Sequence, residues 1–177
     1  MDVLESKINC IPCRYFAVEL FQATLEQFCN GQYTGRMPSD AQVLCQIANG
    51  INFLHGEGLA HGQLNPNTIL IAQPLRMKVS EFGLSRSIRS QTRNFPTCWM
   101  LPGSWSTTTE ENGNEIMTSQ PSVHGDVFAA GCIFFYFLTK GSHPFVSPDT
   151  KDSILENIKN FRPVNLESIP VSMAHSS

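Results

Sequence analysis

A polar stretch near the middle of the chain carries the residues best suited to chemistry. His61, Gln63 and Asn65 alternate within it, and a carboxylate, Glu81, follows after two short apolar runs. A loop histidine is a candidate catalyst, and a carboxylate is a candidate Mg²⁺ ligand. Both also have structural interpretations, since His61 can be a hydrogen-bonded loop residue and Glu81 an ordinary solvated carboxylate. These residue types alone leave both interpretations open.

The two apolar runs predict a β-hairpin between the loop and Glu81. Ile69–Ala72 and Met77–Val79 flank a turn signal at Gln73-Pro74. Short apolar runs on either side of a proline-containing turn are typical of paired strands. The polar loop would then enter this hairpin, and Glu81 would leave it.

Helices are predicted on both sides of this unit. Ser39 followed by Gln42 is a capping box, Gly56 and Gly58 supply a stop, and between them runs an apolar stripe at helical spacing. The stripe consists of Val43, Ile47, Ile51 and Leu54. Residues 126–138 are apolar nearly all round, which predicts a buried helix. At ~1.5 Å per residue that run spans roughly 20 Å, short of the ~30 Å hydrocarbon core of a membrane.

The remaining segments give weaker patterns. Residues 14–20 predict a strand, and residues 21–28, with apolar side chains at 21, 25 and 28, predict a helix. Residues 85–120 are polar without periodicity and predict a long surface segment. His143, before a proline, is interpreted as a turn residue. Residues 152–160 predict a short amphipathic helix, and 163–177 a frayed tail.

Composition narrows the classes of protein. A chain of 177 residues with 41% hydrophobic and 15% charged residues suits one globular domain. A net charge of -3 and a pI of about 5.9 argue against nucleic-acid binding. Six scattered cysteines without a signal peptide favour reduced thiols in the cytoplasm. Cys10 and Cys13 could be half a zinc site or a redox pair, but no second C-x-x-C accompanies them.

The loop, hairpin and Glu81-Phe82-Gly83 together resemble the core of protein kinases, whose loop reads H-R-D-L-x-x-x-N and whose metal-binding tripeptide is D-F-G. Further stretches resemble one branch, the unfolded-protein-response kinase/endoribonuclease of the inositol-requiring type. They are residues 16–25, 51–55, 126–132 and 141–145. The resemblance implies an α+β, mainly α fold, a kinase-like large lobe with the small lobe nearly absent. Residues 1–13 would be a divergent stub, 14–160 the partial kinase-like domain, and 161–177 a flexible tail.

The resemblance assigns degenerate catalytic positions. Gln63 stands where kinases have the catalytic Asp, and Asn65 where they have a Lys. Thr68 aligns with the Asn that binds the second Mg²⁺, while Asn67 sits one residue early. Glu81 replaces the metal-binding Asp of D-F-G.

Other positions follow from the same resemblance. Val18 would be the gatekeeper, with the backbones of Glu19 and Phe21 facing adenine. The structural positions would be His61, Phe82, Gly83 and Asp126, the last hydrogen-bonded back to the loop. The family's G-T-x-G-W stretch is placed at Pro102–Trp105, with its A-P-E replaced by residues 107–110.

These substitutions lead us to expect a catalytically impaired pseudokinase fragment that acts as a binding or regulatory module. The expected partner is a protein, with a full-length kinase relative as one candidate, and neither a nucleic acid nor a membrane. One alternative is a divergent serine/threonine kinase that uses ATP and Mg²⁺. Another is a truncated gene product without independent activity.

Overall fold

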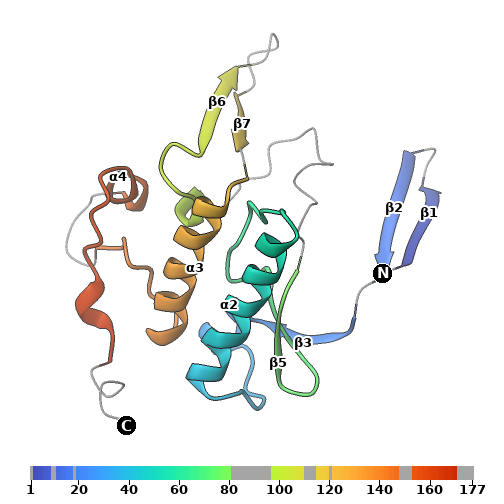
Figure 1. Ribbon diagram of the computed structural model, residues 1–177, viewed down its shortest axis with the longest axis horizontal. Helices are drawn as coiled ribbons and strands as arrows, with labels where there is room; N and C mark the ends of the chain where they lie inside the picture. The colour runs from blue at the N-terminus through green and yellow to red at the C-terminus, as the bar shows by residue number, and fades with distance from the viewer. Residues whose placement is uncertain are drawn as a thin grey trace.

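Two long helices and a small sheet form the body of the protein (Figure 1). The computed structural model describes residues 2–8, 11–17, 19–80, 97–109, 115–119, 121–147 and 153–170. The predicted gatekeeper Val18 and the tripeptide Glu81-Phe82-Gly83 lie outside the described residues. In that part of the chain, no helix is long and apolar enough to cross a membrane.

Helix α2, Asp40–Gly56, confirms the helix predicted from the capping box. The Ser39 hydroxyl accepts a hydrogen bond from the Gln42 backbone N–H at 3.4 Å. The Gln42 side-chain oxygen accepts one from the Ser39 N–H at 3.0 Å. The predicted stripe is the face that α2 buries: Val43, Ile47, Ile51 and Leu54.

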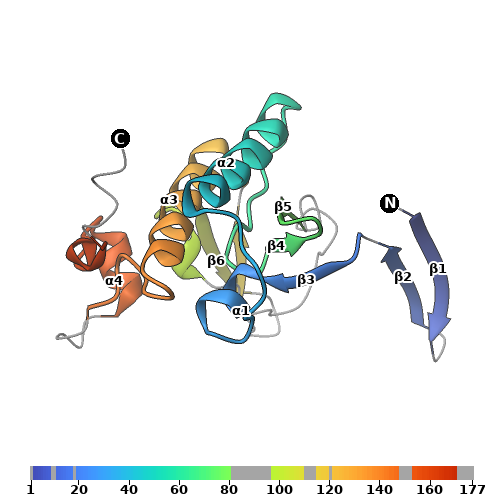
Figure 2. The ribbon, with the colours of Figure 1, turned by 90° about the horizontal axis from the view of Figure 1, so that it is seen from below.

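Helix α3, Val123–Leu138, confirms the predicted apolar helix but begins three residues earlier. The reason is Ser122, whose hydroxyl accepts a hydrogen bond from the Gly125 N–H at 3.0 Å and so caps the helix. α2 and α3 lie side by side in both ribbon views (Figure 2). The core between them and the sheet includes Leu25, Ile47, Ile69, Ile133 and Phe137, none of them exposed.

The sheet has the order β3-β4-β5 and is antiparallel. β4, Ile69–Ala72, and β5, Arg76–Val79, confirm the predicted hairpin. The helix predicted over 21–28 is wrong in its first half, because Phe21–Thr24 forms β3 against β4. Helix α1 covers only Leu25–Cys29, and Thr24 caps it.

The outer segments contain more strand than the sequence predicts. β1, Asp2–Ile8, pairs with β2, Ile11–Ala17, so the predicted strand over 14–20 ends at 17. This hairpin stands apart from the body in Figures 1 and 2. β6, Trp105–Thr109, and β7, Glu115–Ser119, pair within the segment predicted to be irregular.

Short helical turns complete the described chain. The 3-10 turn η2, Thr97–Trp99, lies ahead of β6. α4, Ile154–Lys159, confirms the predicted short helix. The 3-10 turn η3, Leu166–Ser168, lies within the tail predicted to be frayed. Just before it, the Asn165 backbone N–H donates a hydrogen bond to the Pro144 carbonyl at 3.1 Å.

Candidate functional site

Asp126, in the first turn of α3, anchors the loop that carries the candidate residues. Its carboxylate accepts hydrogen bonds from the backbone N–H groups of His61 at 2.7 Å and Gly62 at 2.8 Å. The His55 ring of α2 donates a third through Nε2 at 2.9 Å. Because Asp126 is 2% exposed, these bonds satisfy a charge that would be costly to bury alone. The loop is thereby fastened to both long helices.

His61 is built into the same framework. Its Nε2 lies 2.7 Å from the backbone oxygen of Ser80, and its Nδ1 accepts from the Gln63 N–H at 3.3 Å. A carbonyl only accepts, so Nε2 carries a proton directed at Ser80. The ring is not exposed to solvent and links the start of the loop to the residue after β5. This geometry suits a structural role.

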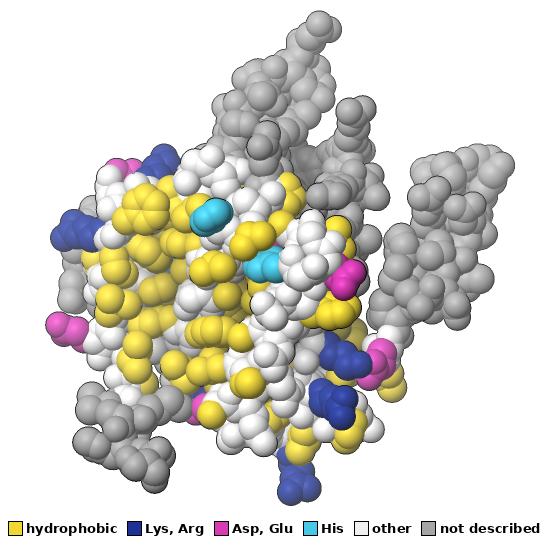
Figure 3. All heavy atoms as spheres, in the orientation of Figure 1, with side chains coloured by type: hydrophobic (Ala, Val, Ile, Leu, Met, Phe, Trp, Pro, Cys, Tyr) yellow, Lys and Arg dark blue, Asp and Glu magenta, His cyan; other side chains and the backbone are white. Residues whose placement is uncertain are grey.

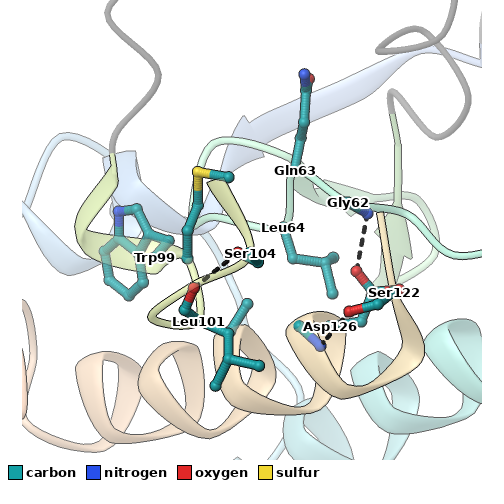
Figure 4. A pocket seen from close by; sticks show the side chains of 11 residues that line it. Gly62, Gln63, Leu64, Trp99, Leu101, Ser104, Ser122 and Asp126 are labelled. Carbon is teal, nitrogen blue, oxygen red and sulfur yellow. Dashed lines mark hydrogen bonds between the residues drawn. The ribbon is translucent and has the colours of Figure 1, made fainter. Parts of the chain in front are cut away.

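Gln63 occupies the position of the kinase base. Its half-buried side chain points away from the other labelled residues of the cleft (Figure 4). A carboxamide has no pKa that allows it to accept a proton from a hydroxyl near neutral pH. The Gln63 carbonyl accepts a bond from the Asn65 side chain at 2.9 Å.

Asn65 and Thr68, the positions of the kinase Lys and second metal ligand, bond to each other and to the loop. The Asn65 side-chain oxygen accepts from the Asn67 N–H at 2.9 Å. The Thr68 hydroxyl accepts from the Asn65 N–H at 3.1 Å and donates to the Asn65 carbonyl at 2.9 Å. Thr68 is 3% exposed. A buried hydroxyl that both accepts and donates a hydrogen bond does not suit the role of a Mg²⁺ ligand.

Asn67 connects the loop to α1, a contact that sequence analysis missed. Its side-chain amide donates to the Glu26 carboxylate, and the Glu26 N–H bonds the Pro66 carbonyl at 3.2 Å. Nothing in the sequence pattern pairs these residues, because the contact depends on β3 lying beside β4. Glu26 therefore ties α1 to the loop.

The residues predicted to face a nucleotide lie at the edge of the sheet. The Glu19 carboxylate forms an ion pair with Lys78 of β5, and both side chains are exposed. Phe21 begins β3 opposite Ala72 and is 40% exposed. Glu19 thus contacts β5, and Phe21 pairs with the end of β4.

A shallow cleft lies between the loop and the start of α3 (Figure 4). Gly62, Gln63 and Leu64 form one wall, and residues 99–101 and 104 form the other. Water can enter about 20 Å³ of it, enough for roughly one molecule.

Trp99 lines that cleft and also packs in the hydrophobic core. It is 9% exposed and packs edge-on against Tyr136 of α3, with ring centroids 5.4 Å apart. Sequence analysis placed the family's Trp at 105, a residue whose side chain the structure does not describe, so that placement stays a prediction. The burial of Trp99 is a feature that sequence analysis missed, because it depends on contact with α3.

His143 also lies in this cluster, although the sequence indicated only a turn residue. Its ring meets the Trp99 ring at 4.6 Å and 76°. It is 5% exposed, and burial lowers its pKa to about 4, with the nearby backbone of Cys98 acting in the opposite direction.

Two of the described thiols, Cys29 and Cys132, are unreactive. Burial raises the pKa of Cys29 to about 11 and that of Cys132 to about 12, so both stay protonated near neutral pH. Within the described ranges no three His, Cys, Asp or Glu side chains are grouped to hold a metal. Cys10 of the C-x-x-C pair lies outside those ranges.

Comparisons with known proteins agree with the kinase-like frame. The family of protein tyrosine and serine/threonine kinases matches residues 6–175. The serine/threonine-protein kinase/endoribonuclease IRE2 of Homo sapiens is 31% identical over 137 residues, covering 74% of this chain and 15% of that protein. The sensor for unfolded proteins in the ER ire1 of Schizosaccharomyces pombe is 34% identical over 153 residues, covering 72% and 14%.

A third relative has a similar identity over a shorter stretch. The probable serine/threonine-protein kinase irlE of Dictyostelium discoideum is 34% identical over 116 residues, covering 58% of this chain and 7% of that protein. This chain therefore spans 15% or less of each of the three relatives. The match over residues 6–175 extends across nearly the whole sequence, and the chain belongs to the protein kinase family.

Proposed function

We propose that this chain is a kinase-like large-lobe module that has lost phosphoryl transfer and acts by binding another protein. The observation that carries the proposal is the hydrogen bonding of the loop. At the position of a phosphate-contacting Lys, the Asn65 side chain bonds the Gln63 carbonyl and the Asn67 N–H of its own loop. At the position of a metal ligand, the Thr68 hydroxyl bonds the Asn65 backbone. Gln63 adds an amide where a carboxylate is needed.

The magnitudes support loss of activity. Kinases turn over at about 1–100 s⁻¹, and a positioned base contributes about 10²–10⁴-fold. Loss of the base alone would bring turnover to roughly 10⁻² s⁻¹ in the middle of these ranges. The loss of a metal ligand at Thr68 removes charge stabilisation as well, although the two effects need not multiply.

An apolar stripe on α3, exposed over its first half and half-buried at Phe134 and Leu138, supports a binding role. Its members recur every three or four residues and so share one face: Val123, Val127, Gly131, Phe134 and Leu138. Val127 is 60% and Val123 46% exposed. Figure 3 shows apolar side chains gathered where α3 lies in Figure 1. A contiguous exposed apolar surface on a helix marks a protein interaction site.

The partner we propose is a full-length kinase relative, which shares the fold that this chain carries in part. The test is binding of the purified 177-residue chain to a purified full-length kinase/endoribonuclease relative, followed by biolayer interferometry. Val127→Asp should weaken binding at least tenfold, because it puts a charge into an apolar contact. Leu20→Asp is the matched control, since Leu20 is 88% exposed and lies on the segment before β3. No binding, or equal binding by both variants, would refute the proposal.

A second candidate, a divergent kinase that uses ATP and Mg²⁺, is favoured by one observation. The bonds that Asp126 makes to the loop hold a scaffold suited to positioning substrates. The metal would then depend on Glu81, since Thr68 does not fit. This candidate requires Mg²⁺-dependent ATP turnover that Glu81→Ala abolishes.

A further inference from the structure

We propose that His143 is an acid-sensitive latch, which holds η2 and the wall of the cleft on α3 while its ring is neutral. The ring stacks edge-on against Trp99, and its other neighbour is Phe145, with centroids 5.9 Å apart. Trp99 in turn packs on Tyr136 of α3. The same Trp99 lines the cleft beside Gln63. His143 therefore lies behind the residue that shapes the cleft.

The hydrogen bond from Phe145 requires the neutral form of the ring. Nδ1 accepts the Phe145 backbone N–H at 3.3 Å. A proton added at Nδ1 would face that N–H, and the bond would be lost. Nε2 is buried and has no hydrogen-bond partner within the described residues. Protonation would thus place a charge in an apolar cluster and break one of its contacts.

The side chains next to the ring are neutral, and the backbone of Cys98 favours the protonated ring less than burial opposes it. From η2 and α3 come the thiols of Cys98 and Cys132 and the phenol of Tyr136, all with raised pKa values and therefore neutral. The Asn157 and Asn165 amides bond backbone carbonyls. The charged residues of α4, Glu156 and Lys159, are exposed. Glu26 of α1 raises the pKa values of Cys98 and Tyr136, and its carboxylate bonds Asn67. Burial also lowers the pKa of His143.

The consequence is a local opening in mild acid. When the pH falls below the usual pKa of histidine, about 6.5, the protonated ring is stable only where water reaches it. Its release frees the edge of Trp99 and loosens η2 from α3. α2 and most of α3 need not unfold, because the aromatic partners of the ring, Trp99 and Phe145, both lie outside these helices.

The test follows the fluorescence of Trp99 in the full chain carrying Trp105→Phe, from pH 8 to pH 4, with far-UV circular dichroism in parallel. We expect a red shift of the emission with a midpoint between pH 6.5 and 4, while the helical signal is retained. His143→Asn should abolish the shift, because an Asn oxygen can accept the Phe145 N–H without titrating. His124→Asn, at an exposed histidine of α3, should leave it unchanged.

Emission that stays constant to pH 4, or a shift that survives His143→Asn, would overturn the proposal. If His143→Asn does not fold at pH 8, an NMR titration of the His143 ring replaces it. A ring midpoint that coincides with the movement of the Trp99 indole signal supports the latch. A ring midpoint separate from it contradicts the latch.

Discussion

Replacing Asp126 with Ala should remove the anchor between the loop and the two long helices. The carboxylate is 2% exposed and accepts bonds from the N–H groups of His61 and Gly62 and from the His55 ring. In the variant, all three donors lose their partner, and His61 is closed to water. The loop would have to open to rehydrate the His61 N–H.

The size of the effect follows from these three donors. A buried donor left without a partner costs about 1–3 kcal/mol, and removing one member of a buried charged network costs about 3–5 kcal/mol. We therefore expect a loss of about 3–5 kcal/mol in the free energy of unfolding. Single domains are stable by about 5–15 kcal/mol, so Asp126→Ala would leave a marginal fold.

The assay is urea unfolding of both proteins, with hydrogen exchange at the His61 and Gly62 amides. Asp40→Ala is the control, because Asp40 is exposed and lies 4.0 Å from Lys140, a surface pair worth about 0–1 kcal/mol. A loss below about 1 kcal/mol for Asp126→Ala, or unchanged exchange at these two amides, would show that Asp126 does not anchor the loop.

Three further predictions use other parts of the structure. Gly62→Ala should lower the free energy of unfolding by about 2–4 kcal/mol, since the φ of Gly62 is +76° and a Cβ would lie 2.6 Å from Pro121. Gly58→Ala, where φ is +70° and the space is open, should lower it by about 1–2 kcal/mol. Equal losses in thermal unfolding would contradict this. Burial lowers the pKa of His143 from 6.5 to about 4, so the unfolded chain binds the proton more readily than the folded one. The free energy of unfolding should therefore fall by up to about 3 kcal/mol as the pH drops from 6.5 to 4. Denaturant midpoints at pH 7 and pH 4.5 measure this loss, and an unchanged midpoint argues against it. Gln63→Asp should restore a carboxylate yet yield no phosphoryl transfer, and measurable ADP release would show that the base was the only missing group.

The sequence predicts best where local signals and packing agree. Ser39 and Gln42 mark the start of α2, and the apolar stripe that follows is the buried face. The runs around Gln73-Pro74 form the hairpin because both strands lie within one short segment. Such signals need no knowledge of distant residues.

Tertiary pairing decides the segments that the sequence analysis predicted wrongly. The spacing of apolar residues at 21, 25 and 28 suggests a helix, but Phe21–Thr24 gains hydrogen bonds by pairing with β4. The burial of Trp99 was not predicted, because it depends on Tyr136 and His143, which lie far along the chain. Local propensity is a weak guide where such contacts compete.

The candidate site was predictable in residue type but not in hydrogen bonding. The sequence shows that Gln63, Asn65 and Thr68 replace the residues of a kinase loop. Only the structure shows that the Thr68 hydroxyl both accepts from and donates to Asn65. It also reveals the contact between Asn67 and Glu26, which no spacing rule predicts.

The most direct test of the central claim is ATP turnover by the full chain, once a cooperative melt has shown that it is folded. We expect no Mg²⁺-dependent ADP release above that of a buffer blank, because the loop has neither a base at Gln63 nor a metal ligand at Thr68. Mg²⁺-dependent turnover that disappears in Glu81→Ala would contradict the account and favour a divergent kinase.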